Sequence, residues 1–414
     1  MTASGSPSML PAMTTEEAEH SQRVSQAIRA RIEAAGGWLP FDEFMELALY
    51  APGLGYYTAG GVKIGHGGDF TTAPELSDLF STCVARQCSE VLARGGAILE
   101  LGAGTGRMAA AIMTALAALE CLPERYFILE VSADLRARQQ DRIGQLPAEL
   151  RDRVEWLDAL PARPLRGVIL ANEVLDALPC RRLVVRDGRA IELGVGIERA
   201  ATGIAVTGDA SRSRESEWRF VEQEAADTGD GARATDLDAD WAAIDASLHG
   251  SVWGGALPNG YRTELCTRIN PWIASLSDSL ESGLILLFDY GLPRAHYYHP
   301  QRSNGTLRCH FKQRAHDDPF INVGVQDITA WVDFTRVAEA ADAAGLEVRG
   351  FATQAAFLLG LGIESLVAGP RLASEARQLL MPGEMGEAFK AMALTRAFDE
   401  SLSGFSVQDL RHSL

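Results

Sequence analysis

Residues 97–106 read AILELGAGTG, an apolar run that ends in an acid and three glycines spaced as G-x-G-x-G. The run predicts a buried strand, and Gly102, Gly104 and Gly106 predict a tight turn where a ligand can lie against bare backbone. The spacing differs from the dinucleotide fingerprint G-x-G-x-x-G. Glu100 would repel a pyrophosphate, and it suits a ligand with positive charge, such as the sulfonium and amino group of S-adenosylmethionine. A purely structural glycine turn is the alternative.

From residue 96 onward, the sequence alternates between predicted strands and predicted helices. The strands are expected at residues 98–101, 126–130, 154–157, 167–171, 283–289 and 346–351, and helices at 107–119, 134–143, 269–281 and 334–344. This alternation is typical of βαβ units. We therefore predict an α/β fold with a Rossmann-like, doubly wound, mostly parallel sheet.

The rest of the chain is expected to flank or interrupt this core. A hairpin is expected at residues 182–185 and 190–194, joined through Asp187-Gly188, and a polar, acidic stretch follows at 198–250. The expected organisation is a disordered leader (1–14), N-terminal helices with a glycine-rich loop (15–95), core halves (96–180 and 266–360, with an irregular loop at 292–327), an insertion (181–265) and C-terminal helices (361–414). Further helices are expected at 15–35, 41–50, 74–92, 364–380 and 384–402.

Composition excludes several classes of protein. The 414 residues carry a net charge of −17, and no Lys/Arg stripe with interleaved aromatics appears, which argues against nucleic acid as a partner. The apolar runs are too short to cross a membrane, and the first residues do not resemble a secretory signal. The six cysteines form no C-x-x-C pair and no zinc spacing, so we expect reduced thiols, no metal and a cytoplasmic, bacterial protein.

Ligands of open α/β sheets bind beyond the carboxyl ends of the strands, so the residues there are the candidates for a site. Glu130 follows the second strand, with Val131 beside it, and its carboxylate can accept hydrogen bonds from ribose hydroxyls. A helix-capping acid is the alternative for Glu130. Asp158 follows the third strand and is a weaker candidate for the adenine end.

The fourth strand ends in NEVLDALP, residues 172–179, which places two carboxylates and an amide together. Glu173 could hold a guanidinium, because carboxylates bind that group bidentately. Arginine must also lose a proton as it is methylated, and a nearby His could accept it. Asn172 and Asp176 could instead only cap the following turn.

Several motifs together resemble the MidA family of class I S-adenosylmethionine-dependent methyltransferases, which includes the mitochondrial complex I assembly-factor arginine methyltransferase. The combination of GDFTTAPELS with NEVLDALP is specific to that family, whereas ELGAGTG alone is shared by many methyltransferases. The motifs are MELALYAPGLGYY (45–57), GDFTTAPELSDLF (68–80), ELGAGTG (100–106), residues 130–132, NEVLDALP (172–179), LFDYG (287–291) and GVQDITAWVDF (324–334).

The resemblance implies a class I methyltransferase sheet of seven strands, an N-terminal helical region and an inserted substrate-side subdomain. It implies S-adenosyl-L-methionine as the cofactor and symmetric dimethylation of an arginine on a protein, either the complex I subunit beside the quinone site or a bacterial counterpart. It also implies that the GDF segment closes over cofactor and substrate. Trp331, where the family commonly has His, and Val323, where Pro is usual, depart from the pattern on the substrate side.

The strand ends and the motifs give two sets of candidate site residues. The candidate catalytic residues are Glu173, Asn172, Asp176 and His316. The candidate cofactor-binding residues are Asp69, Phe70, Thr72, Pro74, Glu75, Glu100, Gly102, Ala103, Gly104, Gly106, Glu130, Val131, Asp158 and Asn172. Asp69 could reach the amino group of the methionine moiety, with a loop-capping acid as the alternative.

Other functions stay open at this point. An NAD-dependent oxidoreductase is disfavoured by the missing G-x-G-x-x-G and by Glu100. A non-catalytic assembly factor that keeps the fold would be supported by a degenerate glycine turn, and this turn is intact. Methylation of a small molecule is also possible, since only the resemblance points to arginine.

Overall fold

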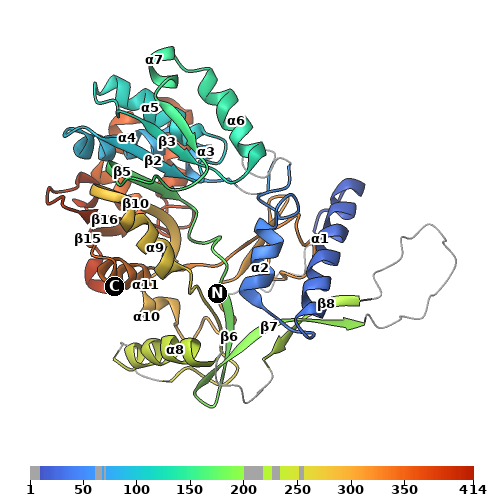
Figure 1. Cartoon of the computed structure of the whole chain (residues 1–414). Helices are drawn as coiled ribbons and strands as arrows, with labels where there is room; N and C mark the ends of the chain where they lie inside the picture. Colours follow the sequence, from blue (N-terminus) through green and yellow to red (C-terminus); the bar gives the residue numbers. More distant parts are fainter. Residues whose placement is uncertain (1–9, 61–67, 70, 200–217, 226–233, 251–255) are drawn as a thin grey trace. The chain divides into compact units, whose positions relative to one another are not determined.

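The computed structural model describes residues 10–60, 68–69, 71–199, 218–225, 234–250 and 256–414. Phe70, much of the expected leader and part of the acidic stretch lie outside these residues. The chain forms two compact units, coloured by sequence in Figure 1. Unit 1 comprises Met1–Tyr57, Pro179–Thr267 and His299–Ile328, and unit 2 comprises Thr58–Leu178, Arg268–Tyr298 and Thr329–Leu414.

Unit 2 is built on a seven-stranded, mostly parallel sheet with the strand order β15-β16-β10-β5-β2-β3-β4. Only β16 runs antiparallel to its neighbours. The order reverses at β2, which is the topological switch point where ligands of such sheets bind. The predicted α/β class is confirmed. The strands are β2 (Ala97–Leu101), β3 (Tyr126–Leu129), β4 (Val154–Leu157), β5 (Leu165–Asn172), β10 (Leu280–Leu292), β15 (Glu347–Thr353) and β16 (Phe389–Arg396), and a short strand β14 (Val332–Asp333) pairs with the end of β10.

Helices cover the sheet because its central strands are apolar on both faces. All five residues of β2 are buried, as expected for a parallel strand with helices on either side. The helices of unit 2 are α3 (Ala73–Leu76), α4 (Asp78–Leu92), α5 (Arg107–Ala118), α6 (Ala133–Gly144), α7 (Ala148–Arg151), α9 (Ile269–Asp278), α10 (Arg294–Tyr297), α11 (Phe334–Ala343), α12 (Gln354–Gly360) and α13 (Gly369–Leu380).

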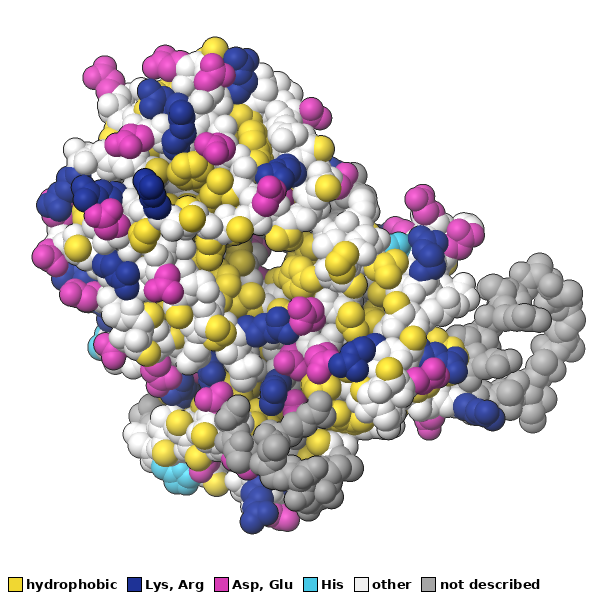
Figure 2. All heavy atoms as spheres, viewed as in Figure 1, with side chains coloured by type: hydrophobic (Ala, Val, Ile, Leu, Met, Phe, Trp, Pro, Cys, Tyr) yellow, Lys and Arg dark blue, Asp and Glu magenta, His cyan; other side chains and the backbone are white. Residues whose placement is uncertain are grey.

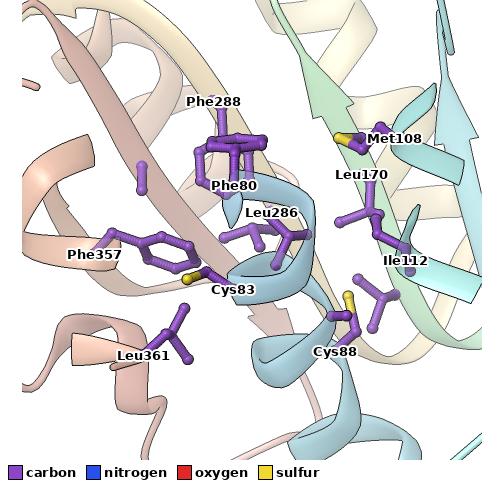
Figure 3. Close-up of a cluster of buried hydrophobic side chains, with 14 of the residues drawn as sticks. Phe80, Cys83, Cys88, Met108, Ile112, Leu170, Leu286, Phe288, Phe357 and Leu361 are labelled. Carbon is purple, nitrogen blue, oxygen red and sulfur yellow. The ribbon is translucent and has the colours of Figure 1, made fainter. Parts of the chain in front are cut away.

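An apolar core lies between the sheet and helices that include α4, α5 and α12 (Figure 3). The ring of Phe288 in β10 belongs to this core. Phe80 from α4 and Phe357 from α12 meet it edge-on, with ring centroids 5.0 and 5.1 Å away. Such edge-to-face pairs add to the stabilisation from burial. This packing fixes β10 against α4, and so helps to position the carboxyl ends of the strands.

The C-terminal segment corrects one prediction, because the helix expected over residues 384–402 is wrong. The sequence FKAMALTR instead forms β16, inserted antiparallel between β10 and β15. Ala, Met and Leu favour helix locally, but a strand buried on both faces also reads as an unbroken apolar run. Pairing with two neighbours decides the structure here. The helix expected over 74–92 is likewise divided, since Ser77 ends α3 and caps α4 through Leu79 N–H at 3.2 Å.

Unit 1 carries a five-stranded antiparallel sheet and a three-stranded sheet. The expected hairpin is confirmed, with Asp187 and Gly188 at φ 49° and 76° in the turn, as a tight hairpin requires. The elements are α1 (Thr15–Ala34), β1 (Leu39–Pro40), α2 (Phe41–Tyr50), β6 (Arg181–Arg186), β7 (Arg189–Arg199), β8 (Trp218–Glu224), α8 (Ala234–His249), β9 (Arg262–Leu265), β11 (Arg308–Phe311), β12 (Arg314–His316) and β13 (Asp327–Thr329), whose last residue belongs to unit 2. The first sheet has the order β1-β7-β6-β9 with β8 beside β7, and the second has the order β12-β11-β13.

The charged side chains are mixed in sign on the face shown in Figure 2, where the described Lys and Arg side chains are interspersed with Asp and Glu. Ion pairs among the described residues include Arg94 with Glu400 and Arg166 with Glu281. Within the described ranges, no helix is both long enough and apolar enough to span a bilayer.

Candidate active site

The glycine turn lies at the carboxyl end of β2. Gly102, Gly104 and Gly106 have φ values of 64°, 53° and 78°, in the left-handed region that favours glycine. The Gly102 N–H donates to the carbonyl of Leu129 at 3.0 Å, which joins the ends of β2 and β3. Gly106 caps α5, so the N-terminus of that helix opens onto the turn. The turn therefore presents backbone without side chains at the switch point.

Glu100 is a buried residue of β2, close to the start of this turn. Its carboxyl group is 2% exposed and accepts a hydrogen bond from Tyr126 Oη at 2.7 Å. Burial raises the pKa of Glu100 to about 7, while the Tyr126 hydroxyl acts in the opposite direction. The acid is thus held by β3, and its contact with a ligand stays a prediction.

Glu130 follows β3 at the same edge of the sheet. One carboxylate oxygen accepts the Ser132 N–H at 2.8 Å and the other accepts Gln139 Nε2 at 2.9 Å. Burial raises the pKa of Glu130, and these hydrogen bonds oppose that effect. The Val131 N–H also donates to this carboxylate, and the lone pairs that remain can accept a ligand hydroxyl. Next to it, the side chain of Val131 is 73% exposed, which leaves an apolar surface at the strand end.

Asp158 follows β4, and its side chain is 88% exposed. It forms an ion pair with Arg136 of α6 at 2.6 Å. Nothing else in the structure assigns Asp158 a role.

The segment that precedes α4 contacts the glycine turn. The Thr105 hydroxyl donates a hydrogen bond to the Glu75 carboxylate, and the Arg107 guanidinium donates one to the Glu75 carbonyl. Arg107 also pairs with Asp78 at 2.9 Å. Thr72 precedes α3 as its N-cap residue, Pro74 lies in its first turn, and Asp69 is buried. The structure thus brings Glu75 to the turn.

Glu173 occupies an unusual position after β5. Its φ of 54° lies in the left-handed region, which a non-glycine residue adopts at an energetic cost. The Glu173 N–H donates to the Phe288 carbonyl at 2.8 Å, and Asn172 Nδ2 donates to the Glu173 carboxylate at 3.1 Å. Such backbone strain clusters at functional sites.

Asp289 of β10 holds the loop that follows Glu173. One of its oxygens accepts the N–H groups of Leu175 at 2.9 Å and Asp176 at 3.2 Å, and the other accepts the Tyr290 N–H at 2.9 Å. The Tyr290 hydroxyl donates to the Asp176 carboxylate. The sequence reasoning assigned no role to Asp289 or Tyr290, although the LFDYG motif contained both.

The carboxylates of this loop repel one another in a buried setting. Burial raises the pKa of Asp176 to about 6, and the Tyr290 hydroxyl opposes the shift. Burial raises the pKa of Asp289 well above its usual range, and the charges of Asp176 and Glu173 add to that shift. Trp331 packs near this cluster, with its ring 6.4 Å from that of Tyr290. We call Glu173, Asp176, Asp289 and Tyr290 the acid cluster.

His316 belongs to unit 1, whereas the acid cluster belongs to unit 2. Burial lowers the pKa of His316, so the imidazole is neutral at pH 7 and can accept a proton. Its Nδ1 accepts the Asp318 N–H at 3.3 Å. Its role as the proton acceptor stays a prediction. Val323, the second departure from the family pattern, is buried in unit 1.

Comparison with known proteins identifies the family. The model of the Methyltransf_28 family, S-adenosyl-L-methionine-dependent methyltransferases, matches residues 83–352. The protein arginine methyltransferase NDUFAF7 homolog of Drosophila melanogaster is 26% identical, with 95% of this chain and 90% of that protein covered. The NDUFAF7 protein of Danio rerio is also 26% identical, over 86% of this chain and 83% of its own.

Two solved structures from Burkholderia thailandensis share the whole architecture. One, a methyltransferase-like protein bound to S-adenosylhomocysteine, is 37% identical and has a TM-score of 0.86, with 98% of this chain and 100% of that chain covered. The other, in its native form, has a TM-score of 0.83 at the same identity and coverage. These matches support S-adenosylmethionine over NAD as the cofactor. The chain belongs to the Methyltransf_28 family, the MidA-like family that its motifs resemble, and is an S-adenosylmethionine-dependent methyltransferase.

Proposed function

We propose that this methyltransferase acts on arginine in a protein and forms symmetric dimethylarginine. The observation that carries the proposal is Glu173, held in a strained conformation at the end of β5 beside the buried Asp176 and Asp289. Several carboxylates at one strand end suit a cationic acceptor, and a guanidinium matches a carboxylate bidentately. The relatives named as protein arginine methyltransferases support the same acceptor.

The residues at the switch point fit S-adenosylmethionine. Gly102 and Gly104 leave room for the ligand to lie against backbone, and the Glu130 carboxylate would accept a hydrogen bond from a ribose hydroxyl. Val131 offers an apolar side chain to the adenine ring. When bound, the cofactor supplies a methyl group on a sulfonium, which leaves as the neutral thioether when the acceptor nitrogen takes the methyl. The other residues of the proposed cofactor side are Asp69, Thr72, Pro74, Glu75 and Ala103.

On the acceptor side, Glu173 would orient the guanidinium and localise its charge away from the nitrogen that reacts. Asn172 donates to the Glu173 carboxylate and so restricts its rotation. Alignment of this kind can supply a large part of the rate of an in-line transfer. The methylated nitrogen must lose a proton, and His316 in its neutral form is our candidate acceptor.

The protein target would be a complex I subunit that carries an arginine beside the quinone site, or a bacterial counterpart, and assembly of that complex would be the process served. Relatives that are named arginine methyltransferases support a protein target. A net charge of −17 is compatible with a basic substrate. A cytoplasmic location stays part of this proposal.

The test is a comparison of methylated proteins in wild-type cells, deletion cells and cells complemented with the Glu173→Gln variant. Mass spectrometry should find an arginine-dimethylated peptide that disappears in the deletion and is not restored by Glu173→Gln. Glu155→Gln, at an exposed position of β4, is the matched control and should restore it. Full restoration by Glu173→Gln would contradict the assignment of Glu173, and an unchanged set of methylated peptides would point to a small-molecule acceptor.

A further inference from the structure

Gln139 of α6 is fully buried and contacts three different strand ends. Its Nε2 donates to the Glu130 carboxylate at 2.9 Å and to the Gly104 carbonyl at 2.9 Å. Its Oε1 accepts a hydrogen bond from Trp156 Nε1 of β4 at 3.0 Å. One side chain thus joins the acid after β3, the glycine turn after β2, and β4.

The chemistry of these partners fixes the orientation of the amide. The Trp156 indole N–H is only a donor, so it must face the amide oxygen, whereas the ionised carboxylate and the carbonyl are only acceptors and must face the NH₂ group. An amide supplies two donors and an acceptor on one planar group. A carboxylate at position 139 would face two acceptors, and an aliphatic side chain would remove one hydrogen bond from each of the three partners in a buried site.

Gln139 also packs tightly against the turn. A Cβ atom on Gly106 would lie 3.1 Å from the Gln139 Cα, so α6 approaches the first turn of α5 as closely as glycine allows. The turn and the acid would both shift if this contact were altered. Gln139 therefore bridges Gly104 and Glu130 and also packs against Gly106.

We propose that Gln139 is a positioning residue of the cofactor site, which holds the Glu130 carboxylate and the glycine turn at the spacing that the nucleoside of S-adenosylmethionine requires. The inference rests on the proposed role of Glu130 toward the ribose. It is independent of the methyl acceptor, because cofactor affinity can be measured without one. Failure of the Gln139 proposal would not affect the arginine proposal, and failure of the arginine proposal would not affect the Gln139 proposal.

The first experiment titrates the full chain with S-adenosylhomocysteine by calorimetry at pH 8. Gln139→Leu should weaken binding by about 10- to 100-fold, as expected when hydrogen bonds to a buried charged group are lost. Gln140→Leu changes the adjacent, exposed residue of the same helix and should bind within about twofold of wild type, within the usual range of surface substitutions. Glu130→Gln should also weaken binding. Wild-type affinity in Gln139→Leu, or in Glu130→Gln, would overturn the proposal.

The second experiment separates positioning from simple packing through pH. The charged groups near Glu130 are Arg136, which lowers its pKa, Glu100 of β2, and Asp158, which pairs with Arg136. Deprotonation of Glu130 favours ribose binding, so wild-type affinity should be constant or increase as pH rises from 6 to 8. Gln139→Glu should show the opposite trend, since the two carboxylates can share a proton at pH 6 and repel one another at pH 8.

This pH trend also keeps the proposal testable if Gln139→Leu fails to fold. Trp156→Phe offers a milder test, because it removes the indole N–H that orients the amide and keeps the two hydrogen bonds that Gln139 donates, so it should weaken binding less than Gln139→Leu does. A Gln139→Glu protein whose affinity changes with pH in the same direction and to the same extent as wild type would show that position 139 only fills space.

Discussion

The cofactor side and the acceptor side of unit 2 are held together in different ways. Around the glycine turn, one neutral amide joins the parts of the site, and its partners lie close in sequence: Gln139 is 35 residues from Gly104 and 9 from Glu130. The acid cluster joins β5 and β10 through buried carboxylates that lie 113 to 114 residues from their partners. An acid held by a neutral amide suits a ligand bound through its hydroxyl groups, whereas several buried acids at one strand end suit a cation.

The largest expected effect tests the acceptor side alone. Glu173→Gln should lower kcat for methyl transfer by about 10²- to 10³-fold, the range seen when an electrostatic group aimed at the reacting centre is removed. Affinity for S-adenosylhomocysteine should stay within about twofold of wild type. Glu173 is not one of the proposed cofactor contacts, and substitutions away from such contacts usually have small effects. A radiolabelled transfer assay measures the first and calorimetry the second. A large loss of cofactor affinity would mean that the two sides are not separable.

Asp289→Asn should have the next largest effect. The amide that replaces the carboxylate keeps one acceptor oxygen, so its NH₂ group would face either the Tyr290 N–H or the N–H groups of Leu175 and Asp176, and the loop after β5 should shift. We expect a destabilisation of about 1–3 kcal/mol, the range for unsatisfied buried groups, together with reduced transfer. Denaturant unfolding and the transfer assay check this result. Asp78→Asn, at an exposed ion pair with Arg107, is the control and should unfold within about 1 kcal/mol of wild type.

The pH dependence should separate activity from stability. Burial raises the pKa of Asp176 to about 6, so the ionised form needed to bind a cation appears as pH rises through that value, and transfer should increase. The stability contribution has the opposite sign: a carboxyl whose folded pKa is raised stabilises the fold below its unfolded pKa and loses that contribution as pH rises from about 4 to 6.

Tyr290→Phe sharpens this prediction. The Tyr290 hydroxyl lowers the pKa of Asp176, so its removal should move the midpoint of the rate profile to higher pH. Rates measured from pH 5 to 8 on both proteins check it. An unchanged midpoint would show that Asp176 does not control acceptor binding.

The difference between the cofactor side and the acceptor side also explains which features could be predicted from the sequence. The β2 turn and the acid after β3 are local patterns, so Gly102, Gly104, Gly106 and Glu130 could be placed from spacing alone, and the parallel sheet followed from strand–helix alternation. The strand β16 could not be predicted from the sequence, because an apolar run suits either a helix or a strand until its neighbours are known. Asp289 and Tyr290 act through residues more than a hundred positions away, which no local pattern encodes. Gln139 appears in sequence as an ordinary polar residue of an amphipathic helix.

The smallest expected effect concerns Asp158, the candidate for the adenine end. Its side chain is exposed and paired with Arg136, and exposed ion pairs contribute about 0–1 kcal/mol. Asp158→Asn should therefore change the affinity for S-adenosylhomocysteine by no more than about fivefold. A larger loss of affinity that is also found with adenosine, and is not found with methionine, would assign Asp158 to binding of the adenine. It would also mean that the cofactor side uses an exposed charge, in contrast to the buried Glu130 carboxylate that Gln139 holds.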